Sequence, residues 1–262
     1  MILLFFSVIV ILVLVQIRFN LFAPPANGLP ILMYHKVSDT YKSGTSVTVE
    51  QLERQFQFIL EENYTCIRLS DLIDPNFKFP AKPLLITFDD GYLNNFELLY
   101  PMLIRFKLHA SIMLPVKYIG LTSEWETEPP LPLMDFVHLR QMEAQYVEFG
   151  LHSYAHKNYN TLTTAEIAND LAKCFRILSD NKIPFLPVLA YPFGAYPRQQ
   201  PDKQQFFSTL EKNGILAGLR IGNRFNHQGT TNSFELKRID IKGTDSFFTF
   251  KTKLTKGRVR MF

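Results

Sequence analysis

The chain has 262 residues, of which 47% are hydrophobic and 20% charged, so it is large enough to bury a sizeable core. This composition excludes a mainly disordered protein. The formal net charge of +4 becomes −1 without the five basic residues of the last stretch, which are Lys251, Lys253, Lys256, Arg258 and Arg260. Because a nucleic-acid protein usually carries its basic surface on the folded domain, we expect no nucleic-acid partner.

The N-terminus is apolar from Met1 to Val15 except for Ser7, and the first charged residue is Arg18. We expect residues 1–20 to form an uncleaved signal-anchor or transmembrane segment, because no small-x-small cleavage motif follows. Its length falls between that of a secretory signal (~7–15 residues) and that of a spanning helix (~17–25). The position of Arg18 after the segment runs against the positive-inside rule, and a buried core helix is the alternative.

The proline-containing stretch that follows predicts a linker over 21–29, ahead of a catalytic domain over 30–255 and a basic tail over 256–262. With a membrane anchor, the domain would lie outside the cytoplasm, in the periplasm or at the cell surface. The basic tail is either a solvated terminus or a contact for anionic glycans or phospholipid headgroups.

Between the linker and the tail, apolar runs of strand length alternate with stretches of helical period, which predicts an α/β domain with one sheet closed or nearly closed by helices. The strands are expected at Pro30–Tyr34, Thr65–Leu69, Leu84–Phe88, Ala110–Leu114, Val147–Leu151, Val188–Tyr191 and Arg238–Ile241. One helix begins at Thr48, where Thr48 and Gln51 form a capping box, and the others are expected at Asn94–Phe106, Asp135–Ala144, Thr164–Leu178 and Asp202–Lys212.

The longest irregular stretch runs from Pro115 to Leu133 and contains Trp125, the only tryptophan of the chain. Long loops in small domains are often functional. Trp125 is therefore expected either to stack on a sugar ring or to fix the loop to the core.

Two adjacent carboxylates, Asp89 and Asp90, follow the apolar run Leu84–Phe88. Ligands of parallel sheets bind at the carboxyl ends of the strands. One carboxylate could hold a cation while the other acts as a base. An ordinary Asp-Gly turn is the alternative for this motif taken alone.

A second strand, Val147–Leu151, leads into His152 and His156. Imidazoles four positions apart on one helical turn project to the same side and can bind one metal, although such a pair alone is often a surface accident. Both motifs lie at strand ends of the same predicted sheet. One aspartate, two histidines and an open position would make a catalytic rather than a structural metal site.

Three further strand ends carry candidate residues. Pro192 and Gly194 form a turn that could direct a backbone N–H into the site, as an oxyanion hole requires, or form a simple turn. His35 follows the first strand and Arg238 opens the last one. Each of these two is unremarkable alone, as a core histidine or a solvated arginine.

Taken together, these residues resemble the polysaccharide deacetylase family with NodB homology, carbohydrate esterase family 4. Thr87–Gly91 matches the first motif of the family and His152–His156 the second. The segments around His35, Tyr191 and Arg238 look most like the branch that de-N-acetylates poly-β-1,6-N-acetylglucosamine. The resemblance covers about residues 29–255 and implies a distorted (β/α) barrel of about seven strands.

The resemblance also implies roles for the residues named so far. Asp90, His152 and His156 would ligate a metal, with Asp89 as the general base and His35 as the general acid. The turn Tyr191–Gly194 would contact the oxyanion and the acetate. The third family motif normally opens with an arginine, which this chain lacks, so the task of holding Asp89 ionised is assigned to Arg238.

These roles predict a metal-dependent hydrolase that removes N-acetyl groups from an N-acetylglucosamine polysaccharide, with poly-β-1,6-N-acetylglucosamine favoured over peptidoglycan. Two imidazoles and a carboxylate favour zinc, although cobalt, nickel, iron or manganese would also fit. The alternatives are a hydrolase of small amides or cyclic imides and an inactive glycan-binding protein. The sequence identifies no protein partner, and it leaves open whether Cys66 and Cys174 pair.

Overall fold

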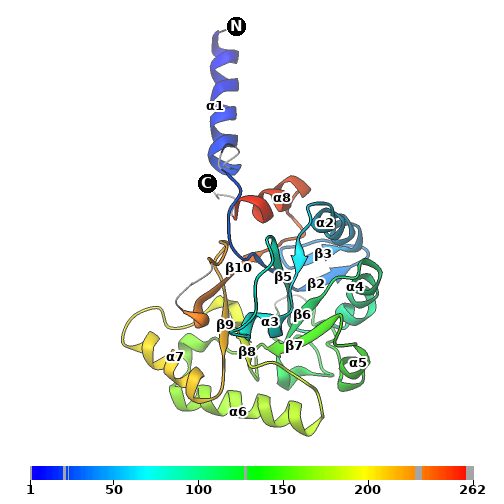
Figure 1. Ribbon diagram of the computed structural model, residues 1–262, viewed down its shortest axis with the longest axis vertical. Coiled ribbons are helices and arrows are strands. Elements are labelled where there is room, and N and C mark those ends of the chain that lie inside the picture. Colours follow the sequence, from blue (N-terminus) through cyan, green and yellow to red (C-terminus); the bar gives the residue numbers. More distant parts are fainter. Residues whose placement is uncertain (1, 20–21, 23, 127–128, 228–231, 258–262) are drawn as a thin grey trace.

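A computed structural model describes residues 2–19, 22, 24–126, 129–227 and 232–257. Its centre is a closed barrel of parallel strands, in which β1 pairs with both β10 and β5 and so completes a ring of seven (Figure 1). Around the ring, the strands are β1 (Ile31–Tyr34), β10 (Leu236–Asp240), β9 (Ala217–Ile221), β8 (Val188–Ala190), β7 (Val147–Leu151), β6 (Ala110–Leu114) and β5 (Pro83–Asp89). The predicted barrel is confirmed.

The barrel strands are buried because helices cover them from outside and their own side chains fill the inside. All seven residues of β5 are buried, as are all residues of β1, β6 and β8. Apolar runs of this kind are typical of strands covered on both faces. The short strand β4 (Thr65–Cys66) pairs with β5 outside the ring, and β2 (Lys36–Ser38) pairs with β3 (Ser46–Thr48) in a separate two-stranded sheet.

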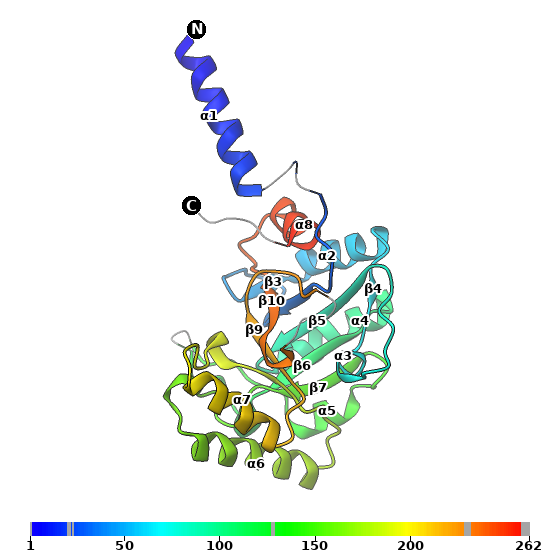
Figure 2. The same cartoon turned by 60° about the vertical axis from the view of Figure 1, so that its left-hand side comes forward.

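Helices surround the barrel (Figures 1 and 2). The capping box is present, since Gln51 N–H donates to Thr48 Oγ1 at 3.1 Å and Thr48 N–H to Gln51 Oε1 at 3.0 Å. The α-helices after the first strand are α2 (Val49–Glu61), α3 (Leu69–Ile73), α4 (Tyr100–Phe106), α5 (Phe136–Gln141), α6 (Thr164–Asp180), α7 (Asp202–Lys212) and α8 (Phe247–Lys256). Single-turn elements occur at η1 (Asn95–Leu99), η2 (Val116–Tyr118), η3 (Tyr159–Thr161), η4 (Pro192–Gly194) and η5 (Ser233–Glu235).

The helix expected at Asn94–Phe106 is divided into the π-helical turn η1 and α4. Pro101 lies at the start of α4 and has no N–H to offer the carbonyl four residues earlier. The chain instead closes a wider turn, in which Tyr100 N–H donates to Asn95 O.

Strand β9 and helix α8 are absent from the sequence-based prediction. The strand has a weak pattern, because it contains Gly218 and Arg220. The glycine is required by packing: a Cβ at Gly218 would lie 1.9 Å from the hydroxyl of Tyr191. Helix α8 contains Lys251 and Lys253, and it ends at Lys256, the first residue of the predicted tail. The remainder of the predicted tail, 258–262, lies outside the described residues.

The N-terminal helix α1 (Ile2–Phe19) projects away from the barrel (Figures 1 and 2). In the described part of the chain, no helix is long and apolar enough to cross a membrane, so the predicted membrane segment is not supported. The alternative of a buried core helix is wrong, because Phe6 and Ile11 are exposed.

The predicted linker lies partly outside the described residues, and its end is fixed to the domain. Ala26 N–H donates to Thr255 O at 2.8 Å, and Leu29 forms an antiparallel bridge with Asn226. Cys66 and Cys174 are both free, which answers the question that the sequence left open.

Candidate active site

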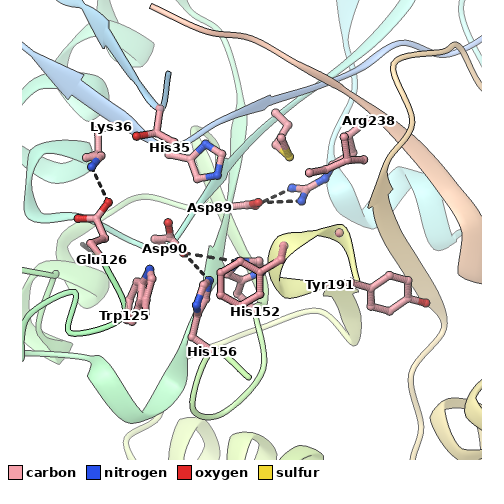
Figure 3. A pocket seen from close by; sticks show the side chains of 15 residues that line it. His35, Lys36, Asp89, Asp90, Trp125, Glu126, His152, His156, Tyr191 and Arg238 are labelled. Atoms are coloured by element: carbon pink, nitrogen blue, oxygen red, sulfur yellow. Dashed lines mark hydrogen bonds and ion pairs between the residues drawn. The ribbon is translucent and has the colours of Figure 1, made fainter. Parts of the chain in front are cut away.

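The carboxyl ends of the barrel strands bring the predicted residues into one cavity of about 350 Å³. They come from four strands of the ring or from the residues directly after them. Asp89 ends β5 and Asp90 follows it, His35 follows β1, His152 follows β7 and Arg238 lies in β10. In Figure 3 these side chains converge from opposite sides of the barrel mouth. Because parallel strands all end at the same side, residues far apart in the sequence meet there.

Asp90, His152 and His156 have the geometry of a metal site. Asp90 Oδ1 lies 3.4 Å from His152 Nε2 and 3.3 Å from His156 Nε2. Ligands about 2.0–2.1 Å from a tetrahedral ion are about 3.3–3.4 Å apart, so one ion would fit between these three atoms. All three residues are buried, and they are the one group of this kind among the described residues.

The protonation states of the three side chains also suit the binding of a cation. His152 Nδ1 lies 2.9 Å from Ala190 O, so this nitrogen carries the hydrogen and Nε2 offers a lone pair. Burial lowers the pKa of His152 to about 4, which keeps the imidazole neutral near pH 7. Asp90 Oδ1 is buried and has no hydrogen-bond partner in the described part of the chain. A carboxylate oxygen and two imidazole nitrogens facing one point fit a divalent metal ion.

The pKa of Asp90 supports the same conclusion. Burial raises the pKa of this carboxyl, but the neighbouring imidazoles of His156 and His152 outweigh burial and hold the pKa well below its ordinary value. The carboxylate is therefore ionised at neutral pH. It places a negative charge between the two imidazoles.

The prediction that His152 and His156 share a helical turn is wrong. His152 comes directly after β7, and the segment up to His156 is a loop in which Ser153 and His156 have positive φ values of 63° and 52°. Asp170 holds this loop, since its carboxylate accepts a hydrogen bond from Tyr154 N–H at 2.9 Å. The loop curls back on itself, so the two imidazoles still reach one point.

Asp89 forms a two-point ion pair with Arg238. The Nη1–Oδ1 and Nη2–Oδ2 distances are 2.5 and 2.7 Å, and only 2% of Asp89 and 1% of Arg238 are exposed. Burial raises the pKa of Asp89, but the guanidinium of Arg238 outweighs it and holds the pKa below its ordinary value. His35 points into the same cavity beside Asp89 (Figure 3). Its Nδ1 is buried, and no described residue forms a hydrogen bond with it.

The turn Tyr191–Gly194 lines the cavity mainly through its backbone and Phe193. Tyr191 N–H donates to Leu219 O and Gly194 N–H to Tyr191 O, while Pro192 has no N–H. The N–H of Phe193 is thus the donor of this turn without an internal acceptor among the described residues. The side chain of Tyr191 points away from the cavity, and its hydroxyl donates to Phe234 O at 2.8 Å (Figure 3). We therefore assign no substrate contact to its ring.

Trp125 lines the cavity and stacks on the ring of His156, with centroids 4.3 Å apart. Two charged residues that sequence reasoning left unassigned lie next to it. Lys36 and Glu126 both line the cavity and form an ion pair of 2.5 Å. The signal for Lys36 was its place directly after His35, and the signal for Glu126 was its place beside the only tryptophan.

Replacing His156 with alanine should remove one of the three ligands and with it most of the bound metal. The measurement is the metal content of protein purified without added metal. His109→Ala is a matched control, because His109 is also buried and lies 3.6 Å from the carboxylate of Glu148, but at the other end of β6. Full metal content in His156→Ala would exclude His156 from the ligand set.

The geometry described so far is that of a parallel α/β barrel with a carboxylate–imidazole site at its carboxyl-terminal mouth. The family model "Polysaccharide deacetylase" matches residues 77–208, which is half of the chain. The chain therefore belongs to the polysaccharide deacetylase family, as its motifs predicted.

Two sequence relatives and one solved structure extend this result. A Bacillus subtilis protein named as a polysaccharide deacetylase, YxkH, is 26% identical over 73% of this chain and 63% of its own length. A Staphylococcus aureus poly-β-1,6-N-acetyl-D-glucosamine N-deacetylase is 25% identical over 75% of this chain and 68% of its own length. IcaB from Ammonifex degensii has a TM-score of 0.72 at 17% identity, over 90% of this chain and 99% of that structure, and thus shares the fold.

Proposed function

We propose that this protein is a metal-dependent hydrolase that removes N-acetyl groups from a polysaccharide containing N-acetylglucosamine. The observation that carries the proposal is the pairing of Asp89 with Arg238 directly beside the Asp90, His152 and His156 group in one cavity. An ionised base next to three metal ligands can activate water for the hydrolysis of an amide.

Asp89 would act as the general base. Arg238 keeps its carboxylate ionised at neutral pH, so Asp89 can accept a proton from the attacking water. His35 lies beside Asp89 in the cavity and would donate a proton to the departing amine nitrogen (Figure 3). An amine leaves poorly as an anion, which makes this second proton transfer necessary.

The backbone N–H of Phe193 is the protein donor that would stabilise the oxyanion formed from the acetyl carbonyl. The positive φ of Phe193, 58°, belongs to the turn that lines the cavity next to His156. Because a backbone N–H is fixed by the fold, it needs no reorganisation as charge develops.

Asp90, His152 and His156 would hold the metal, which when bound would supply positive charge to polarise the acetyl oxygen and acidify water. Two imidazole nitrogens and one carboxylate oxygen favour zinc, with cobalt, nickel, iron and manganese as further candidates. Metal analysis of protein purified without added metal identifies the native ion.

Among polymers, poly-β-1,6-N-acetylglucosamine is favoured and peptidoglycan is next. The support is the relative named as a deacetylase of the first polymer. The match covers only 63% of the length of YxkH, so we infer no substrate from that relative. The expected periplasmic or cell-surface location stays a prediction that accompanies this substrate class.

The test is acetate release from the two polymers side by side, with and without a chelator. We expect release from poly-β-1,6-N-acetylglucosamine oligomers that stops when the chelator removes the metal and returns when metal is added back. Release from peptidoglycan alone would reassign the substrate. No release from either polymer by metal-loaded protein would contradict the proposed function.

A further inference from the structure

The two histidines of the proposed metal site are held in different ways. Nδ1 of His152 bonds to Ala190 O, which fixes the ring. Nδ1 of His156 is buried and has no hydrogen-bond partner among the residues that the structure describes. Metal-ligating histidines usually donate from their second nitrogen to an acceptor that sets the orientation of the ring. His156 lacks such an acceptor, so some other contact must orient it.

For His156, contacts with two aromatic rings orient the imidazole. The indole of Trp125 stacks on the imidazole at 4.3 Å and 25°, and Phe193 meets it edge-on at 4.8 Å and 70°. Phe193 is 59% exposed, so Trp125 is the more confined of the two rings. Figure 3 shows Trp125 standing beside His156. The orientation of His156 thus depends on the position of Trp125.

Trp125 belongs to a long loop, and the next residue fixes that loop to the barrel. Glu126 Oε1 pairs with Lys36 Nζ at 2.5 Å, and Glu126 Oε2 accepts a hydrogen bond from Ser123 Oγ at 2.9 Å. Ser123 is fully buried and also accepts a hydrogen bond from Leu131 N–H at 2.9 Å. Both oxygens of Glu126 are therefore engaged inside the fold.

Lys36 is an unusual anchor for a loop. It follows His35 in the chain and only 1% of it is exposed, although lysine is rarely buried without a partner. Its ammonium group also lies 5.2 Å from the ring of Tyr92, which follows the Asp89–Gly91 motif. The buried ion pair restricts the position of the loop that carries Trp125 and Glu126, because any displacement of Glu126 would leave the buried ammonium group unpaired.

We propose that the Lys36–Glu126 ion pair is a positioning device that seats Trp125 against His156 and so fixes this imidazole in the orientation for metal binding. This inference rests on the proposed function, since it requires Asp90, His152 and His156 to bind a metal. Lys36 and Glu126 are positioning residues, which act on the metal site through Trp125.

Two substitutions distinguish a positioning role of the ion pair from a direct effect of its charges on metal affinity. Lys36→Met removes a positive charge from the cavity, which by charge alone should strengthen the binding of a divalent cation. Glu126→Gln removes a negative charge, which by charge alone should weaken it. If the pair acts by positioning, both variants should weaken binding, by about 10–100-fold, as is typical when the support of a metal ligand is lost.

The probe is Co²⁺ titrated into the metal-free full chain, followed by tryptophan fluorescence. Trp125 is the only tryptophan, so the signal comes from this site alone, and a paramagnetic ion bound at His156 should quench it. We also expect the emission of both metal-free variants to shift to longer wavelength, because the indole leaves its stacked position. Lys203→Met is the control, since Lys203 pairs with Glu235 at 2.7 Å and neither residue lines the cavity.

Each result has a distinct meaning. Opposite changes of Co²⁺ affinity in Lys36→Met and Glu126→Gln, or unchanged affinity in both, would overturn the positioning role. Circular dichroism checks that each variant folds, and if Lys36→Met does not fold, Glu126→Gln and its emission shift decide. If the unaltered protein binds no Co²⁺, the proposed metal site fails instead, and the emission shift alone tests whether the pair seats Trp125.

Discussion

Asp89→Asn should lower the rate of acetate release by about 10²–10⁴-fold and leave the metal content unchanged. Asparagine has nearly the shape of aspartate but cannot accept a proton from water at neutral pH. Its amide oxygen remains within reach of Arg238, so the cavity should keep its shape. The three proposed ligands are untouched, since Asp90 is a separate carboxylate whose Oδ1 faces His152 and His156.

The measurements are acetate release under saturating substrate and metal analysis of the same preparation. Asp245→Asn is a matched control, because Asp245 is also paired with a cation, Lys253, at 2.5 Å, but does not line the cavity. It should retain most of the activity. Loss of the metal in Asp89→Asn would show that the roles of Asp89 and Asp90 are exchanged.

Arg238→Met should destabilise the fold by about 3–5 kcal/mol near neutral pH, because it leaves the buried carboxylate of Asp89 without its partner. Methionine fills much of the space of the arginine stem, so the main loss is the ion pair rather than packing. The free energy of unfolding from urea titrations measures this effect. Arg105→Met is the control: Arg105 pairs with Glu53 on the surface, and a change within about 0.5 kcal/mol is expected.

The same variant should show a characteristic dependence on pH. In the native protein the pKa of Asp89 is lowered, so the ion pair contributes stability above the unfolded-state pKa, and this stability is lost as the pH falls through the folded-state pKa. Without Arg238, burial becomes the main influence and should raise the pKa above the unfolded value. The cost of the buried charge then disappears at acidic pH, where Asp89 is protonated in both states.

The stability difference between the native protein and Arg238→Met should therefore be largest near neutral pH and shrink as the pH falls toward about 4. The acidic limb of the pH–rate profile should move to higher pH, because Asp89 must be ionised to act as a base. A stability difference that stays constant across this range would show that Arg238 contributes through packing and not through the charge of Asp89.

Much of the site could be read from short segments of sequence. The runs that end at Asp89 and His152 are apolar enough to be buried strands, and a polar group directly after such a strand lies at the barrel mouth wherever the neighbouring strands are placed. The capping box at Thr48 and Gln51 is equally local. These features depend on residues a few positions apart, so the sequence by itself determined them.

Other features depend on contacts between distant residues, and only the tertiary structure decided them. Closure of the ring requires β1 to pair with β5, which brings Met33 beside Thr87. The loop that carries His156 replaced the expected helical turn, because positive φ values and the contact with Asp170 shape it. The sequence pattern of strand β9 is weak because of Gly218, and this glycine is needed only because Tyr191, which follows another strand, packs against it.

The two buried ion pairs of the site show most clearly what local sequence determines and what tertiary contacts decide. The motifs predicted Asp89 as a base and, through family resemblance, Arg238 as its partner, but the two residues are 149 positions apart and meet only because the barrel closes. Nothing in the sequence joined Lys36 to Glu126, which are 90 positions apart. Local sequence determines which side chains stand at strand ends, whereas burial and closure of the whole barrel decide which of them pair, since the strength of an ion pair depends on the surroundings that only the folded chain creates.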